Sequence, residues 1–81
     1  MQYTNDPYEN ISNAIVLQAV TDYRNALKGV GYNSIPAEQV IVELEKFFRS
    51  IWYQMLTKVK GEYLIERLNK EHQEKLKKEQ L

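Results

Sequence analysis

Apolar residues recur every three to four positions along three segments of this chain, which is the spacing of amphipathic helices. The first apolar stripe consists of Tyr8, Ile15, Val16, Ala19, Val20, Tyr23, Ala26 and Leu27. The second consists of Ala37, Val40, Ile41, Leu44, Phe47, Phe48, Ile51, Met55 and Val59. The third consists of Leu64, Ile65, Leu68, His72 and Leu76. No strand pattern of useful length accompanies them, so the pattern predicts an all-α protein.

Start and stop signals bound the first of these helices. Asp6 suits the N-cap, Pro7 is favoured at the first helical position, and Glu9 completes a capping box. Gly29 is typical of a C-cap because glycine adopts the left-handed conformation easily. The first helix is therefore predicted over residues 7–28.

Glycines also separate the later helices. The loop over residues 29–34 contains two glycines and an Asn–Ser pair, and its length suits two antiparallel helices. Ser34 or Ile35 then caps a second helix, predicted over residues 36–57, with Pro36 in its first turn. Inside a helix, Gly61 would cost about 1 kcal/mol relative to alanine, so the second helix is expected to break there. A third helix is then predicted over residues 61–76.

These elements predict a small three-helix bundle with a charged helical C-terminal extension. Residues 1–6 are expected to fray, residues 7–68 to form the helical domain, and residues 69–81 to form a charged helical tail. Three acid-before-base pairs with i,i+4 spacing support helix in that tail. They are Glu66 with Lys70, Glu71 with Lys75, and Glu74 with Lys78.

The charge of this 81-residue chain is zero overall but unevenly distributed. Residues 1–45 carry a net charge of −4 and residues 46–81 a net charge of +4. Such asymmetry occurs where two halves, or neighbouring copies, attract each other, and it also occurs at nucleic-acid-binding faces. A dedicated DNA-binding domain usually has a clearly basic balance, which this chain lacks.

The composition leaves little material for catalysis or cofactor binding. The chain has no cysteine and one histidine, so cysteine-based zinc sites and thiol nucleophiles are excluded. We expect no catalytic residue, no metal site and no cofactor. No apolar run approaches the ~18 residues of a membrane span, and the first residues lack a signal core. A cytoplasmic location is expected.

The second predicted helix carries more apolar surface than one face can bury. A second band lies beside its main stripe and contains Trp, Arg and Tyr, the residue types that most often dominate binding energy. This band consists of Val42, Glu45, Arg49, Trp52, Tyr53 and Leu56. We predict it as the contact surface for a partner protein or a second copy of the chain. The third helix could instead bury Trp52 and Leu56, which makes Arg49 and Tyr53 the preferred contact residues.

A nucleic-acid interface is the alternative interpretation. Basic and aromatic residues alternate between Lys46 and Tyr53, as they do in many single-strand binding sites. The basic residues available for phosphate contacts are Lys58, Lys60, Arg67 and Lys70. With so few cations, such binding is expected to be weak and strongly dependent on salt.

Three segments resemble a family of small phage and prophage proteins of Gram-positive bacteria. They are Ala-Ile-Val-Leu-Gln-Ala-Val-Thr-Asp-Tyr-Arg-Asn-Ala-Leu over residues 14–27, Phe-Phe-Arg-Ser-Ile-Trp over residues 47–52, and Gly-Glu-Tyr-Leu-Ile over residues 61–65, continuing to Leu68. An acidic residue commonly precedes the glycine in that family. Lys60 replaces it here, which removes a good N-cap for the third helix.

The resemblance implies a phage setting and transfers no catalytic residue. Inhibitors of CRISPR nucleases and of host replication factors are of similar size. The expected function is therefore that of a non-enzymatic phage accessory protein which inhibits a host or defence protein by stoichiometric binding. A nucleic-acid-binding regulator is the second hypothesis, and an enzyme is the third.

Overall fold

The described part of the chain forms four helices joined by short connections. The computed structural model describes the backbone of residues 7–79 and the side chains of residues 14–79. Helix α1 spans Pro7–Leu27, α2 spans Ala37–Phe48, α3 spans Ile51–Leu56 and α4 spans Gly61–Glu79. No strand occurs within residues 7–79, which confirms the predicted all-α fold. The predicted fraying of residues 1–6 and the Asp6 cap lie outside the described residues.

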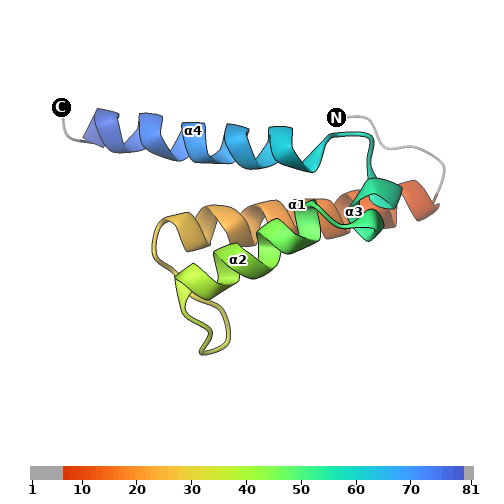
Figure 1. Ribbon diagram of the computed structural model, residues 1–81, viewed down its shortest axis with the longest axis horizontal. Helices are drawn as coiled ribbons and strands as arrows, with labels where there is room; N and C mark the ends of the chain where they lie inside the picture. The colour runs from red at the N-terminus through yellow and green to blue at the C-terminus, as the bar shows by residue number, and fades with distance from the viewer. Residues whose placement is uncertain (1–6, 80–81) are drawn as a thin grey trace.

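The three long helices alternate in direction along the chain, and α3 lies in the connection between α2 and α4 (Figure 1). Helices α1 and α2 are antiparallel, as predicted, and α4 returns beside α1 in the same direction. The helical extension is present, because α4 is continuous through Asn69 to Glu79. Arg24 of α1 pairs with Glu71 of α4 at 3.1 Å and fastens the extension to the bundle.

Helix α1 ends at the predicted glycine. Gly29 has a φ of 90°, and its N–H donates to the Ala26 carbonyl at 2.9 Å. The Val30 N–H donates to the Asn25 carbonyl at 3.0 Å. These two bonds form a Schellman motif, which satisfies carbonyls that the helix end leaves free.

The loop that follows α1 contains a tight two-residue hairpin turn. Asn33 and Ser34 have positive φ angles of 47° and 69°, and Tyr32 and Ile35 exchange backbone hydrogen bonds of 3.0 and 2.8 Å. Two consecutive positive φ angles define the type I′ turn, whose twist suits a hairpin. Because the turn uses Ser34 and Ile35, neither caps α2, and Pro36 occupies the N-cap position without a side-chain bond.

The prediction of one continuous helix over residues 36–57 is wrong. Helix α2 ends at Phe48, and α3 begins at Ile51. Between them, Ser50 is extended, with φ −80° and ψ 159°. The Ser50 hydroxyl accepts a hydrogen bond from the Tyr53 N–H at 3.1 Å and donates one to the Phe47 carbonyl at 2.6 Å. One side chain thus caps the new helix and bonds a terminal carbonyl of the old one, which stabilises the break.

The break rotates α3 relative to the predicted stripe. Tyr53, which belonged to the predicted outer band, is fully buried. Ile51, Met55 and Val59, which belonged to the predicted core stripe, are exposed. Their burial was predicted from continuous helical periodicity, and periodicity does not continue across two non-helical residues.

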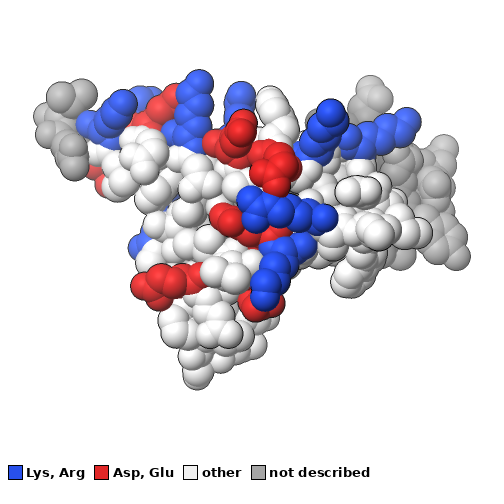
Figure 2. Space-filling model, in the orientation of Figure 1, with Lys and Arg blue, Asp and Glu red and all other residues white. Residues whose placement is uncertain are grey.

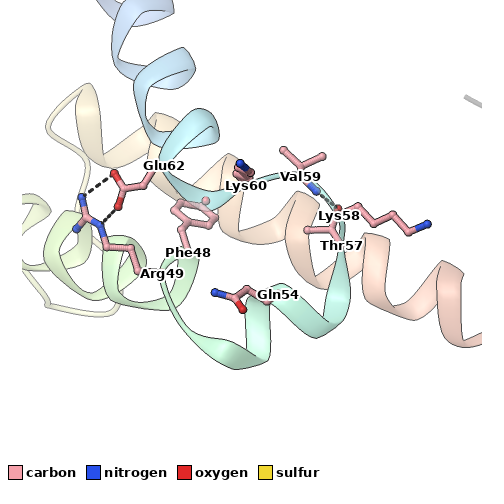
Figure 3. Close-up of a pocket in the computed structure, with 9 residues that line it drawn as sticks. Phe48, Arg49, Gln54, Thr57, Lys58, Val59, Lys60 and Glu62 are labelled. Atoms are coloured by element: carbon pink, nitrogen blue, oxygen red, sulfur yellow. Dashed lines mark hydrogen bonds and ion pairs between the residues drawn. The ribbon is translucent and has the colours of Figure 1, made fainter.

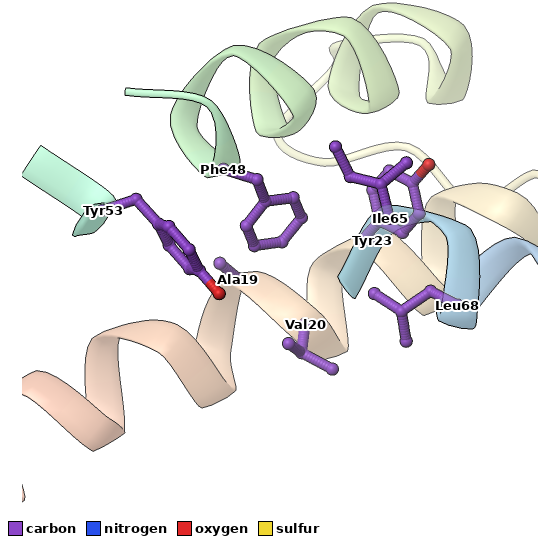
Figure 4. Close-up of a cluster of buried hydrophobic side chains, with 7 residues drawn as sticks. All are labelled: Ala19, Val20, Tyr23, Phe48, Tyr53, Ile65 and Leu68. Carbon is purple, nitrogen blue, oxygen red and sulfur yellow. The ribbon is translucent and has the colours of Figure 1, made fainter. Parts of the chain in front are cut away.

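The core lies between α1, the end of α2, α3 and the first half of α4 (Figure 4). Its buried members are Ala19, Val20, Tyr23, Phe48, Tyr53, Ile65 and Leu68. The Phe48 ring packs edge-on against Tyr23 at a centroid distance of 5.7 Å and against Tyr53 at 5.6 Å. Edge-to-face pairs stabilise a core beyond the area that they bury. Phe48, a member of the second apolar stripe, is therefore a centre of the core.

Candidate protein-binding surface

Helix α3 has a buried side and an unusually exposed apolar side. Tyr53 is buried and Leu56 is half-buried, so the inner side is satisfied by the core. On the outer side, Ile51, Trp52 and Met55 are 75%, 60% and 79% exposed. We call these three residues the α3 knob. Singly exposed apolar residues are ordinary, but three on a helix of six residues form a contiguous patch, and such patches mark interaction sites.

Phe47 supports the knob from the side of the core. The rings of Phe47 and Trp52 pack edge-on, with centroids 5.8 Å apart. Phe47 is itself packed against the core and against Tyr53, with ring centroids 5.7 Å apart. Trp52 is thus a positioned side chain with one edge supported and most of its surface in solvent, which is the form of a binding anchor.

A basic segment follows the knob and borders a groove. Val59 is about half exposed, and Lys58 and Lys60 on either side of it are exposed. No ion pair forms between these lysines and any described acidic residue. They help to line an open groove of about 680 Å³, which Figure 3 shows between the end of α2, the 57–60 segment and the start of α4. The segment that follows the knob in the chain is therefore positively charged.

A polar network lies on the other side of this groove and joins three helices. Arg49 donates to Glu62 from two nitrogens, and its Nη1 lies 3.4 Å from Glu45 (Figure 3 shows the Arg49–Glu62 pair). Glu45 accepts a hydrogen bond of 2.8 Å from the Tyr23 hydroxyl, which also accepts one of 2.9 Å from Asn69. The network ties α2 to α1 and α4.

The pKa values of this network follow from its contacts. Burial, together with the bond to Glu45, raises the pKa of Tyr23 to about 12. The hydrogen bond from Arg49 lowers the pKa of Glu62, and the same bond raises the pKa of Arg49. Each pKa shift favours the protonation state that the hydrogen bonds require: a protonated Tyr23, a charged Arg49 and an ionised Glu62.

The predicted contact band does not exist as one surface. Val42 is half exposed on α2, while Glu45 and Arg49 are engaged in the network. Tyr53 is buried, so the prediction that it contacts a partner from the surface conflicts with the structure. The break at Ser50 separates α2 from α3 and turns the two parts of the band in different directions. Trp52 remains exposed, and Leu56 is half-buried.

The four predicted phosphate contacts fall into two separate pairs. Lys58 and Lys60 border the groove at the start of α4. Arg67 and Lys70 lie further along α4, beside Glu71 and Glu74. Figure 2 shows acidic and basic side chains intermingled along this helix. The described residues therefore do not form one continuous basic face.

The remaining chemistry is sparse in the part of the chain that the structure describes. His72 is half-buried on α4, near Arg24 and Lys75. No group of three or more side chains there could hold a metal ion. None of the described helices has the length and apolar character needed to cross a membrane.

Comparisons with protein-family models, with curated proteins and with solved structures found no match for this chain. The fold and the exposed surface thus have to carry the functional interpretation.

Sequence reasoning missed Ile51 and Met55 as surface residues, although one signal was present. Ser50 lies directly before Ile51 and three residues before Tyr53. Serine is a favoured N-cap residue, and its hydroxyl accepts from the N–H three residues further on. A new helix that begins at Ile51 does not continue the periodicity of the second stripe, so Ile51 and Met55 need not face the core.

Proposed function

We propose that this protein acts without catalysis, by binding another protein through the α3 knob. The observation that supports this most directly is the exposure of Ile51 and Met55, at 75% and 79%, beside the supported ring of Trp52. A marginally stable domain of this size gains nothing for its own fold from three large apolar side chains in water. Their burial against a partner would supply binding energy.

The proposed partner is a host or defence protein, and the proposed setting is the cytoplasm of a phage-infected Gram-positive cell. This part of the proposal rests on the resemblance of residues 14–68 to small phage proteins. Tyr23, Arg49 and Glu62 come from the three resembling segments and belong to the same network. That arrangement supports a shared scaffold that presents α3, with inhibition by occupancy as its mechanism.

A protein partner is favoured over nucleic acid by the charge distribution. The net charge is zero, and the two basic pairs are separate, one before α4 and one within it, with acidic residues beside Arg67 and Lys70. Nucleic-acid binding depends on neutralising several phosphates at once, and few counterions would be released here.

The test uses a double variant, Ile51→Ser with Met55→Ser, and a control, Leu17→Ser. Leu17 is half exposed on α1, so the control removes a comparable exposed apolar side chain elsewhere. Tagged proteins are incubated with lysate of a Gram-positive host, with and without nuclease treatment, and complexes are sized by gel filtration. A partner that elutes in a fixed ratio with wild type and control, but not with the double variant, is expected. Retention by the double variant, or capture that nuclease abolishes, would contradict the proposal.

A further inference from the structure

A small apolar groove lies where α1, the hairpin turn and the middle of α2 meet. It is lined by Val40 and Leu44 of α2 and by Tyr32 and Ile35 of the hairpin turn. Asp22 and Glu43 complete the lining. We call this set of six residues the hairpin groove.

The geometry of the turn sets the shape of this groove. The Ile35 carbonyl occupies the position at which a side chain on Gly31 would begin, so the hairpin can close only over a glycine. This tight closure holds Tyr32 and Ile35 beside α2, where they remain partly exposed. The groove is thus a feature of the backbone and not of one flexible side chain.

The size and polarity of the groove suit a protein side chain. Its volume is about 240 Å³, below the roughly 300–1,000 Å³ of typical small-molecule sites. Asp22 accepts a bond of 3.0 Å from Gln18, and Glu43 lies 3.6 Å from Lys46 in an exposed ion pair. Exposed pairs of that kind contribute little, so both carboxylates keep their attraction for an incoming cation.

The α3 knob has the complementary character. It offers an apolar surface of three large side chains, and the lysines that follow it in the chain, Lys58 and Lys60, have no acidic partner within the described residues. We propose that the α3 knob of one copy of this chain binds the hairpin groove of a second copy. This inference rests on the proposed function, because it uses the same knob and names a second copy of the chain as a ligand for it.

The contact is head-to-tail. The knob lies on α3, whereas the groove is lined by residues of α1, the hairpin turn and α2, so the contact joins two different surfaces. A heterologous contact of this kind builds chains, or rings if the rotation closes. A symmetric contact between two knobs would instead place Lys58 and Lys60 against their own copies, which like-charge repulsion opposes. The head-to-tail contact also brings the acidic first half of one copy to the basic second half of the next.

Two variants, each defective in one half of the contact, provide a direct test. The knob variant is Ile51→Ser with Met55→Ser, and the groove variant is Asp22→Lys with Glu43→Lys. A single Glu43→Lys variant, at an exposed position, serves if the groove variant melts at a lower temperature than wild type. Masses are measured by analytical ultracentrifugation over a range of protein concentrations. Trp52, the only tryptophan, reports burial of the knob by fluorescence.

Wild type is expected to increase in mass with concentration, with a blue shift of Trp52 emission, and added salt should weaken both. Each variant alone should remain monomeric. An equimolar mixture should form a 1:1 heterodimer and nothing larger, because only the groove of the knob variant and the knob of the groove variant are intact. A monomeric wild type up to about 1 mM, or a mixture that stays monomeric, would overturn the inference. So would a groove variant that self-associates like wild type, since this indicates a symmetric contact.

Failure here is distinguishable from failure of the proposed function. The groove variant keeps the α3 knob, so it should still capture a host partner. A wild type that stays monomeric but captures a host partner assigns the knob to that partner alone.

Discussion

The Phe48 carbonyl oxygen occupies the space in which a side chain on Gly61 would begin. Phe48 ends α2 and Gly61 starts α4, so this close approach sets the distance between the two helices at this point. The neighbouring atoms are backbone and cannot move aside as a flexible side chain can. The glycine that marks a helix boundary in the sequence is therefore a packing requirement in the structure.

The Gly61→Ala variant tests which of two opposing effects on stability is larger. Helix propensity alone predicts that Gly61→Ala stabilises the protein, by less than the ~1 kcal/mol of a helix interior because Gly61 is the first residue of α4. The collision with the Phe48 carbonyl predicts a loss of about 3 kcal/mol, since α4 must shift away from α2. We expect the loss, measured as the free energy of unfolding in urea. Gly29→Ala is the matched control: it has open space but a φ of 90°, so it should cost about 1 kcal/mol. A stabilised Gly61→Ala would show that the helices are free to separate.

Phe48 should contribute far more to stability than the residues of the α3 knob. Phe48→Ala removes a ring that is 1% exposed and packs edge-on against two tyrosines, so a loss of about 3–5 kcal/mol is expected. Ile51→Ala removes a side chain that is mostly in water, and its effect should stay within about 0.5 kcal/mol. Chemical denaturation followed by circular dichroism measures both. Equal losses for the two variants would mean that Ile51 is part of the core.

The two buried tyrosines should respond differently to loss of the hydroxyl. The Tyr53 hydroxyl is buried without a hydrogen-bond partner among the described residues, so Tyr53→Phe should leave stability unchanged or raise it by up to about 1 kcal/mol. The Tyr23 hydroxyl bonds Glu45 and Asn69, so Tyr23→Phe should cost about 1–2 kcal/mol. Melting temperatures of the two variants test this contrast. A destabilised Tyr53→Phe would indicate that its hydroxyl does find a partner.

The Arg49–Glu62 pair should make stability depend on acidic pH. Its hydrogen bond lowers the pKa of Glu62 below the ordinary value of 4.5. A carboxyl with a lowered folded-state pKa stabilises the fold above its unfolded pKa, and that contribution is lost as pH falls through the folded pKa. Melting temperature should therefore decline from about pH 5 downward. Glu62→Gln should show a shallower decline, because its amide does not titrate. Identical profiles for variant and wild type would exclude a contribution from this pair.

Local signals predicted much of the helical architecture. The first stripe predicted the burial of Ala19, Val20, Tyr23 and Ala26, and all four are buried. Gly29 was predicted to end the first helix and adopts the required positive φ. These features depend on the few residues around them, such as a repeat of about 3.6 residues or a left-handed C-cap, so they can be read from the chain without its neighbours.

The exposed side of α3 depended on information that the chain does not carry locally. Ser50 is compatible with the interior of a helix and with an N-cap, and only the packing of Tyr53 against Phe47 and Phe48 selects the cap. That selection buries Tyr53 and exposes Ile51 and Met55. The sequence by itself determined that the chain is helical and where its glycine boundaries lie, because those properties are local. The tertiary structure alone decided which side of α3 faces water, because that depends on which aromatic rings fill one shared core.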